Sequence, residues 1–181
     1  MDNHSFLLAA LERKIMDVIL FAREQEDQLA QYYSELTAIT RTKTVCEILK
    51  MIGDAHTNHR RILDAITQVI SPLLHPSRIL TNGSSLIRKM EQYGLFSSSA
   101  SDSIELYQGI MDVELQIEQF YKEERCHLDA PFRKDIFMKL GREAHRHYIL
   151  MHNLCELLTN EDTFLEDIEF QGTSKCKTCA C

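Results

Sequence analysis

The feature that most constrains this chain is an internal repeat at a constant offset of 88 residues. The segment EDQLAQYYSE, which begins at Glu26, returns as ELQIEQFYKE from Glu114. The same offset further along the chain pairs His59 with His147. One constant spacing over two separated segments indicates a chain built from two similar halves. Each half contributes one Glu and one His.

Apolar residues recur at helical spacing in four long segments of the chain. The sequence contains only three prolines and six glycines, which favours long uninterrupted helices. We predict helices over about residues 6–36, 44–70, 102–125 and 131–158. Thr44 and Glu47 predict a capping box at the start of the second helix, and Ser71-Pro72 predicts its end.

Residues 72–101 break this pattern, around a short helix expected from Ser85 to Tyr93. The breaks are Pro72, Pro76, Asn82, Gly83, Gly94 and the run SSSAS. The links near residues 37–43 and 126–131 are short, so each can join only antiparallel neighbours. Two such pairs joined by one long crossover predict an all-α fold, a ferritin-like up-down four-helix bundle over residues 1–158. Residues 159–181, acidic and then rich in Cys, are expected to form a flexible tail.

Composition narrows the classes of partner. The chain of 181 residues is 44% hydrophobic, which fits one globular domain with a core. A net charge of −7 argues against nucleic-acid and anionic-membrane partners, which require a cationic face. No apolar run approaches the roughly 20 residues of a membrane span, and the start MDNHSF lacks the features of a signal peptide. We therefore expect a cytoplasmic protein.

Each predicted helix places a metal-competent side chain near its middle, on the apolar stripe. An isolated buried carboxylate costs several kcal/mol, so two of them require protons, cationic partners or a metal ion. A single Glu on such a stripe is commonly a partly exposed residue at the edge of the bundle, and a single His is commonly a core histidine with its hydrogen bonds satisfied. The recurrence of both residues in both halves nevertheless favours a metal site. Imidazole and carboxylate donors suit iron, manganese or zinc. The candidate ligands are Glu26, His56, His59, Glu114, Glu143 and His147.

Two further pairs of residues recur at the same offset of 88 positions. Tyr33 and Tyr121 lie seven residues after the two Glu residues, where they are ordinary core tyrosines or hydrogen-bond donors to ligating carboxylates. Gly53 and Gly141 are expected to allow close approach of helices.

This order of residues resembles the rubrerythrin branch of the ferritin-like di-iron proteins, over about residues 5–158. The resemblance implies first-helix ligands at Glu26 and Glu114 and histidine ligands at His59 and His147. It also implies a non-haem iron redox protein that reduces peroxide or dioxygen, or oxidises ferrous iron, with an electron donor and as a homodimer. Where the family has the Glu of its Glu-x-x-His motif, this chain has His56 in one half and Ala144 in the other.

These departures leave three interpretations of the core. Glu143 and Glu118 replace the missing carboxylates, which gives an atypical dinuclear centre. Alternatively, one ion is held by Glu26, Glu114 and the three histidines. In the third interpretation no ion binds, His56 pairs with the carboxylates, and the protein is a binding module on a ferritin-like scaffold.

The end of the chain carries Cys176, Cys179 and Cys181 in a Cys-x-x-Cys-x-Cys pattern. Three thiolates at this spacing can hold a soft metal ion, and they also permit reversible disulfides. The tail therefore supports a further hypothesis, a metal storage or delivery protein.

Overall fold

The computed structural model describes residues 3–68, 77–93 and 101–159, and this part of the chain is helical without any strand. The helices are α1 (Asn3–Ile39), α2 (Lys43–Thr67), α3 (Ile79–Tyr93), α4 (Ser101–Glu124) and α5 (Pro131–Thr159). A short 3-10 helix, η1 (Arg125–His127), joins α4 to α5. The prediction of an all-α chain with four long helices is confirmed.

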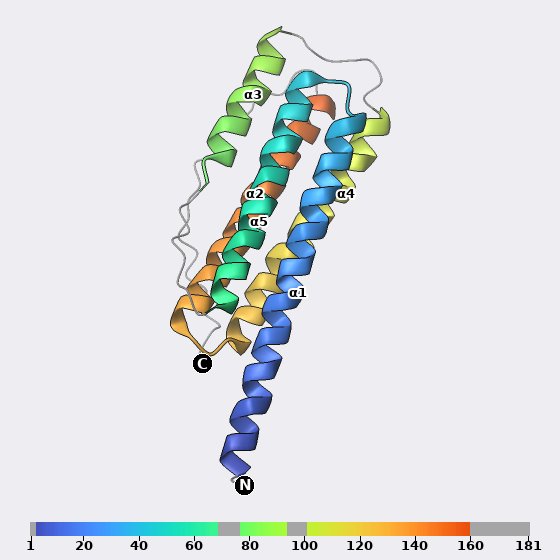
Figure 1. Ribbon diagram of the computed structural model, residues 1–181. Helices are drawn as coiled ribbons and strands as arrows, with labels where there is room; N and C mark the ends of the chain where they lie inside the picture. Colours follow the sequence, from blue (N-terminus) through green and yellow to red (C-terminus); the bar gives the residue numbers. More distant parts are fainter. Residues whose placement is uncertain (1–2, 69–76, 94–100, 160–181) are drawn as a thin grey trace.

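The four long helices form two antiparallel hairpins that lie side by side (Figure 1). One hairpin is α1 with α2, and the other is α4 with α5. The crossover between them contains α3, which packs along the outside of the bundle against α5 and α2. The N-terminal end of α1 extends beyond the ends of the other helices (Figure 1).

The start of α2 differs from the prediction. Thr42 precedes the helix and makes no side-chain capping hydrogen bond, so the predicted box of Thr44 and Glu47 is wrong. Thr44 already lies in the first turn of α2 because the link from α1 is shorter than expected. The helix also ends earlier than predicted, at Thr67, whose hydroxyl donates a hydrogen bond to the carbonyl of Asp64.

Helix α3 is longer than the predicted segment from Ser85, because it begins at Ile79 and includes Gly83. A glycine inside a helix costs about 1 kcal/mol relative to alanine. Packing explains its presence: a Cβ atom at this position would collide with the side chain of Leu150 in α5. Gly83 thus lets α3 lie close enough to bury Ile79 and Ile87 in the core.

The bundle core consists of two hydrophobic clusters at different levels along its axis. One contains Tyr33 with side chains of α2, α3 and the C-terminal half of α5. The other contains Tyr121 with side chains of α1, the end of α2 and the first half of α5. Buried polar side chains from four helices lie near both tyrosines, and they form the candidate site described below.

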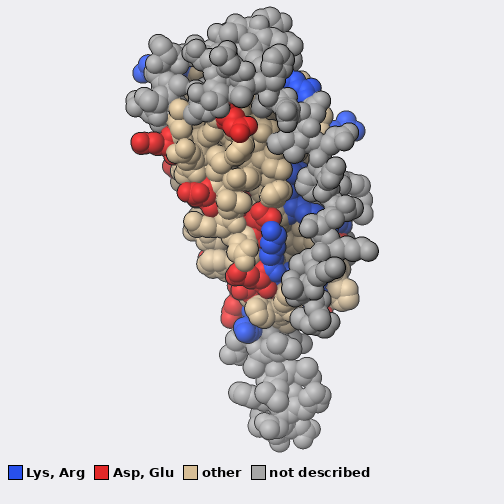
Figure 2. Space-filling view, turned by 180° about the vertical axis from the view of Figure 1, so that it is seen from behind, with Lys and Arg blue, Asp and Glu red and all other residues tan. Residues whose placement is uncertain are grey.

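The surface carries charges of both signs. On the face in Figure 2, much of the described surface is uncharged, and Lys and Arg side chains lie among Asp and Glu. Among the described helices, none combines the length and apolar character needed to cross a membrane.

Candidate metal centre

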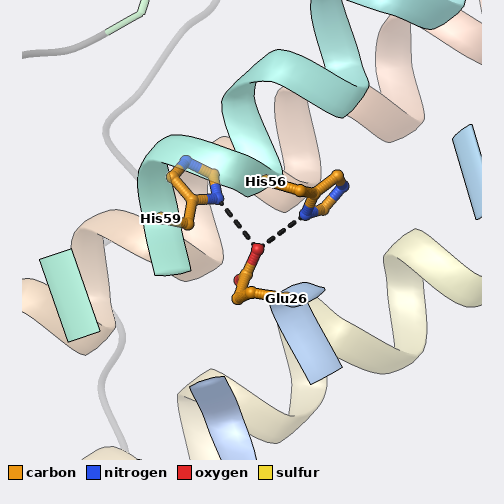
Figure 3. A group of neighbouring side chains, drawn as sticks. All are labelled: Glu26, His56 and His59. Atoms are coloured by element: carbon orange, nitrogen blue, oxygen red, sulfur yellow. Dashed lines mark hydrogen bonds and ion pairs between the residues drawn. The ribbon is translucent and has the colours of Figure 1, made fainter. Parts of the chain in front are cut away.

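Glu26 of α1 is almost fully buried and accepts hydrogen bonds from three side chains. Its Oε2 lies 2.6 Å from Nδ1 of His56 and 3.2 Å from Nδ1 of His59. These two histidines are three residues apart on α2, so they share the helix face that points toward Glu26 (Figure 3). The other oxygen, Oε1, accepts a hydrogen bond from the hydroxyl of Tyr121.

Glu114 of α4 has a matching environment. Its Oε2 lies 3.3 Å from Nδ1 of His147 in α5, and its Oε1 lies 3.1 Å from Nε2 of His56. The hydroxyl of Tyr33 donates a hydrogen bond to the same Oε1 atom. The carboxylate, both imidazoles and the tyrosine are all buried.

The two tyrosines therefore cross between the halves of the repeat. Tyr33 follows Glu26 on α1 but bonds to Glu114, whereas Tyr121 follows Glu114 on α4 but bonds to Glu26. The repeat pairs Glu with Tyr along the sequence, but it does not indicate which Glu each Tyr contacts. That pairing depends on how the two hairpins face each other.

Two glycines let these tyrosines sit deep in the bundle. A Cβ atom at Gly53 would lie 3.1 Å from Cβ of Tyr33, and one at Gly141 would lie 3.3 Å from Cβ of Tyr121. Both distances are tighter than ordinary van der Waals contact. The expected close helix approach at these two positions is confirmed.

His56 is the one residue shared by both environments. Its two ring nitrogens face different carboxylates, Nδ1 toward Glu26 and Nε2 toward Glu114. Ala144 occupies the corresponding position of the second half and carries no polar side chain. One imidazole ring therefore lies between the two carboxylates, whereas a fully symmetric repeat would place two polar side chains there.

The buried carboxylates and histidines of this cluster shift one another's pKa values. Burial opposes ionisation of both carboxyl groups, but the attraction of the neighbouring histidines outweighs it. His59 and His56 hold the pKa of Glu26 well below its usual range, and His147 and His56 lower the pKa of Glu114 to about 2. Burial likewise opposes a charged His56, yet Glu114 and Glu26 raise its pKa to about 10. In the metal-free chain, an imidazolium ring thus bonds both carboxylates.

The hydroxyl of Tyr33 and the ring of His147 stay uncharged. Burial, followed by the charge of Glu114, raises the pKa of Tyr33 far above its usual value, so its hydroxyl remains a donor. Burial lowers the pKa of His147 despite the nearby Glu114 carboxylate. With Nδ1 donating to Glu114, the Nε2 atom of His147 is buried without a hydrogen-bond partner among the residues that the structure describes. The neutral ring thus has one lone pair that no described group uses.

The donor atoms form two groups of three that suit a metal ion. Glu26, His56 and His59 make one group, and His56, Glu114 and His147 make the other. Within each group the donor atoms lie within 4.8 Å of one another, and all five residues are buried. Carboxylate and imidazole are donors for iron, zinc and manganese, and a lone pair without a partner on His147 fits a ligand role.

The remaining candidates point elsewhere. The carboxylate of Glu143 is buried against Ser77, which donates from its backbone N–H and its hydroxyl, and against Arg146. The carboxylate of Glu118 bonds His145 and Lys122. Neither belongs to the two donor groups. Sequence periodicity could not exclude Glu143, because its partner Ser77 comes from the irregular crossover.

The predicted thiolate site falls outside the residues that the structure describes. It comprises Cys176, Cys179 and Cys181.

Comparisons with models of protein families, with curated proteins and with solved structures found no match to this chain.

Proposed function

We propose that this protein is a non-haem metalloprotein that binds iron in the core of a ferritin-like bundle. The observation that carries the proposal is the pair of buried donor groups that share His56. Two carboxylates and three imidazoles from four helices converge at one level of the core. Such a set of oxygen and nitrogen donors matches the preference of iron, and of manganese or zinc.

The proposed reaction is the reduction of peroxide or dioxygen, or the oxidation of ferrous iron. The reduction of peroxide or dioxygen would require an external electron donor. Bound iron would supply one-electron chemistry that Glu and His side chains do not provide. Glu26, His56, His59, Glu114 and His147 would hold it. Manganese or zinc would fit the same donors, but zinc has no redox chemistry.

The surrounding residues have separate tasks. Tyr33 and Tyr121 orient the carboxylates by hydrogen bonds, a contact that fixes ligand geometry in metal sites. The two hydrophobic clusters above and below the site exclude water and strengthen the attraction between the carboxylates and a cation. Because the histidines and carboxylates are almost fully buried, only small molecules such as peroxide or dioxygen fit the proposed role of substrate.

One observation favours a second function, that of a binding module without a metal. Every carboxylate oxygen of Glu26 and Glu114 already accepts a hydrogen bond from Tyr or His. A polar network with satisfied members can stabilise a unique core by itself. The buried Nε2 atom of His147 without a partner weighs against this function, since such a group costs about 1–3 kcal/mol.

Reconstitution with ferrous iron tests the proposal. The protein is purified without oxygen, and the three tail cysteines are replaced by Ser in all samples to isolate the core. We expect iron to bind and the loaded protein to consume peroxide or dioxygen, and Glu26→Gln with Glu114→Gln to abolish both. Glu118→Gln is the matched control, because Glu118 lies on α4 outside both donor groups. Equal iron content in the double variant and the control would contradict the proposal.

A further inference from the structure

We propose that His56 bridges two metal ions through its two ring nitrogens, so that the core holds a dinuclear centre joined by imidazole rather than by carboxylate. This inference rests on the proposed metal-binding function and specifies the arrangement of that site.

The direction of the two nitrogens carries the proposal. Nδ1 of His56 lies 2.6 Å from Glu26, and Nε2 lies 3.1 Å from Glu114. The lone-pair directions of these two nitrogens diverge across the ring, so one ion cannot accept both. In Figure 3 one nitrogen of His56 points at Glu26 and the other points away from it.

Apart from His56, each of the two donor groups, here called half-sites, contains the same kinds of ligand. On one side, Glu26 and His59 supply an oxygen and a nitrogen, and on the other side Glu114 and His147 do the same. His56 is the only member of both groups. Each ion would thus have three protein donors, with further positions left for small ligands.

The difference between the two halves of the repeat explains why a single histidine lies between the two half-sites. Only the first half has a donor at this position, since the second half has Ala144, a small buried residue. The ring of His56 lies between the two Glu carboxylates, and its centroid is 5.0 Å from that of His147. One side chain on the boundary between the halves therefore serves both.

The protons of His56 are accounted for in this arrangement. In the metal-free chain both N–H groups of His56 face carboxylates. When both nitrogens coordinate, two metal–nitrogen bonds replace two N–H bonds, and both protons pass to the solvent. The resulting imidazolate and two carboxylates carry three negative charges against the four positive charges of two divalent cations, so the centre carries one net positive charge, which one anionic small ligand would neutralise.

The spacing of the ions distinguishes this centre from a carboxylate-bridged one. Two metal–nitrogen bonds of about 2.0–2.1 Å, with the ring between them, hold the ions about 6 Å apart. Dinuclear hydrolytic and transfer centres have ions about 3.5–4 Å apart. An imidazole bridge therefore favours independent small ligands on each ion.

A comparison of three histidine variants tests the bridge. Zn(II) is the probe, and all proteins carry Ser at the three tail cysteines. Tightly bound zinc is counted by elemental analysis, and affinity is measured by competition with a coloured chelator. We expect two tight ions in the parent protein and one each in His59→Ala and His147→Ala. In His56→Ala we expect none, because both affinities fall by at least about 10–100-fold.

The outcomes separate this inference from the proposed function. One tight ion remaining in His56→Ala, or one ion in the parent protein, would overturn the bridge while leaving a metal-binding core. No tight core ion in the parent protein, with either zinc or ferrous iron, would overturn both. If His56→Ala does not fold, as judged by circular dichroism, His56→Gln replaces it with the same expected result.

Copper supplies a second readout. Two Cu(II) ions joined through one imidazole ring are magnetically coupled, so the doubly loaded parent protein should give a weaker EPR signal than His59→Ala loaded with one ion. Additive, uncoupled signals from two ions would contradict the bridge.

Discussion

The hydroxyl of Tyr33 donates a hydrogen bond to the carboxylate of Glu114, which lies 81 positions along the chain and in the other half of the repeat. Tyr121 makes the reciprocal contact with Glu26. Each carboxylate is thus oriented by a tyrosine from the opposite hairpin. The candidate site is complete only when the two hairpins have packed together.

Removing one tyrosine hydroxyl should weaken the half-site across from it. In Tyr33→Phe the buried Glu114 loses a donor, so we expect a loss of about 1–3 kcal/mol in the free energy of unfolding. Metal affinity at the half-site of Glu114 should fall about 10–100-fold. Urea denaturation and chelator competition measure the two effects. Tyr32→Phe is the control, since Tyr32 is only partly buried, and equal behaviour of both variants would contradict this role of Tyr33.

The stability of the metal-free protein should fall toward both strongly acidic and alkaline solution. The pKa of His56 rises from 6.5 to about 10 on folding, so its contribution is fully present below pH 6.5 and is lost as the pH rises toward 10. The pKa of Glu114 falls from 4.5 to about 2, so its contribution is present above pH 4.5 and is lost as the pH falls toward 2. Urea midpoints of chelator-treated protein across this range measure the profile.

The matched variant for this profile is His56→Gln, which lacks the titrating ring. We expect the decline in stability above pH 6.5 to become shallower in this variant. A decline as steep as that of the parent protein would show that His56 is not charged in the folded chain.

Replacement by Ala should have opposite effects at two helical glycines, because only one of them lies in a tight helix contact. Gly83→Ala forces the buried side chain of Leu150 to move, and overpacking of this kind costs about 1–3 kcal/mol. Gly109→Ala in α4 meets no atom within 4 Å and should stabilise the protein by up to about 1 kcal/mol. Thermal denaturation compares the two. Stabilisation by both variants would mean that α3 does not pack closely on α5.

Thiol reactivity should report the burial of α5. Burial raises the pKa of the Cys155 thiol to about 11, whereas Cys126 is exposed in η1. At about pH 8, iodoacetamide should modify Cys126 rapidly and Cys155 only after unfolding. Peptide mass spectrometry distinguishes the two sites. Similar rates in native protein would contradict the burial of Cys155.

Much of this arrangement could be predicted from the sequence, because it depends on periodicity. The repeat placed Glu26 and Glu114 on two helices and His59 and His147 on two others, and the structure brings all four into one buried cluster with His56. Periodicity assigns a residue to a helix face. It therefore succeeds where the partner lies on the facing helix.

The remaining features depend on contacts that periodicity does not encode. Glu143 lies near the same stripe as His147, but Ser77 from the crossover and Arg146 bind its carboxylate. The sequence pattern predicts a helix break at Gly83, although the contact with Leu150 of a distant helix requires a glycine there. Both cases involve the crossover, where turn residues and tertiary packing compete.

Anomalous diffraction from crystals of iron-loaded protein, recorded at the iron absorption edge, tests most directly whether the buried Glu and His side chains form a metal centre. We expect two peaks between the hairpins, one beside Glu26 and His59 and one beside Glu114 and His147, about 6 Å apart with His56 between them. Iron peaks only at other positions, with His56 still hydrogen-bonded to both carboxylates, would contradict a metal centre in this core.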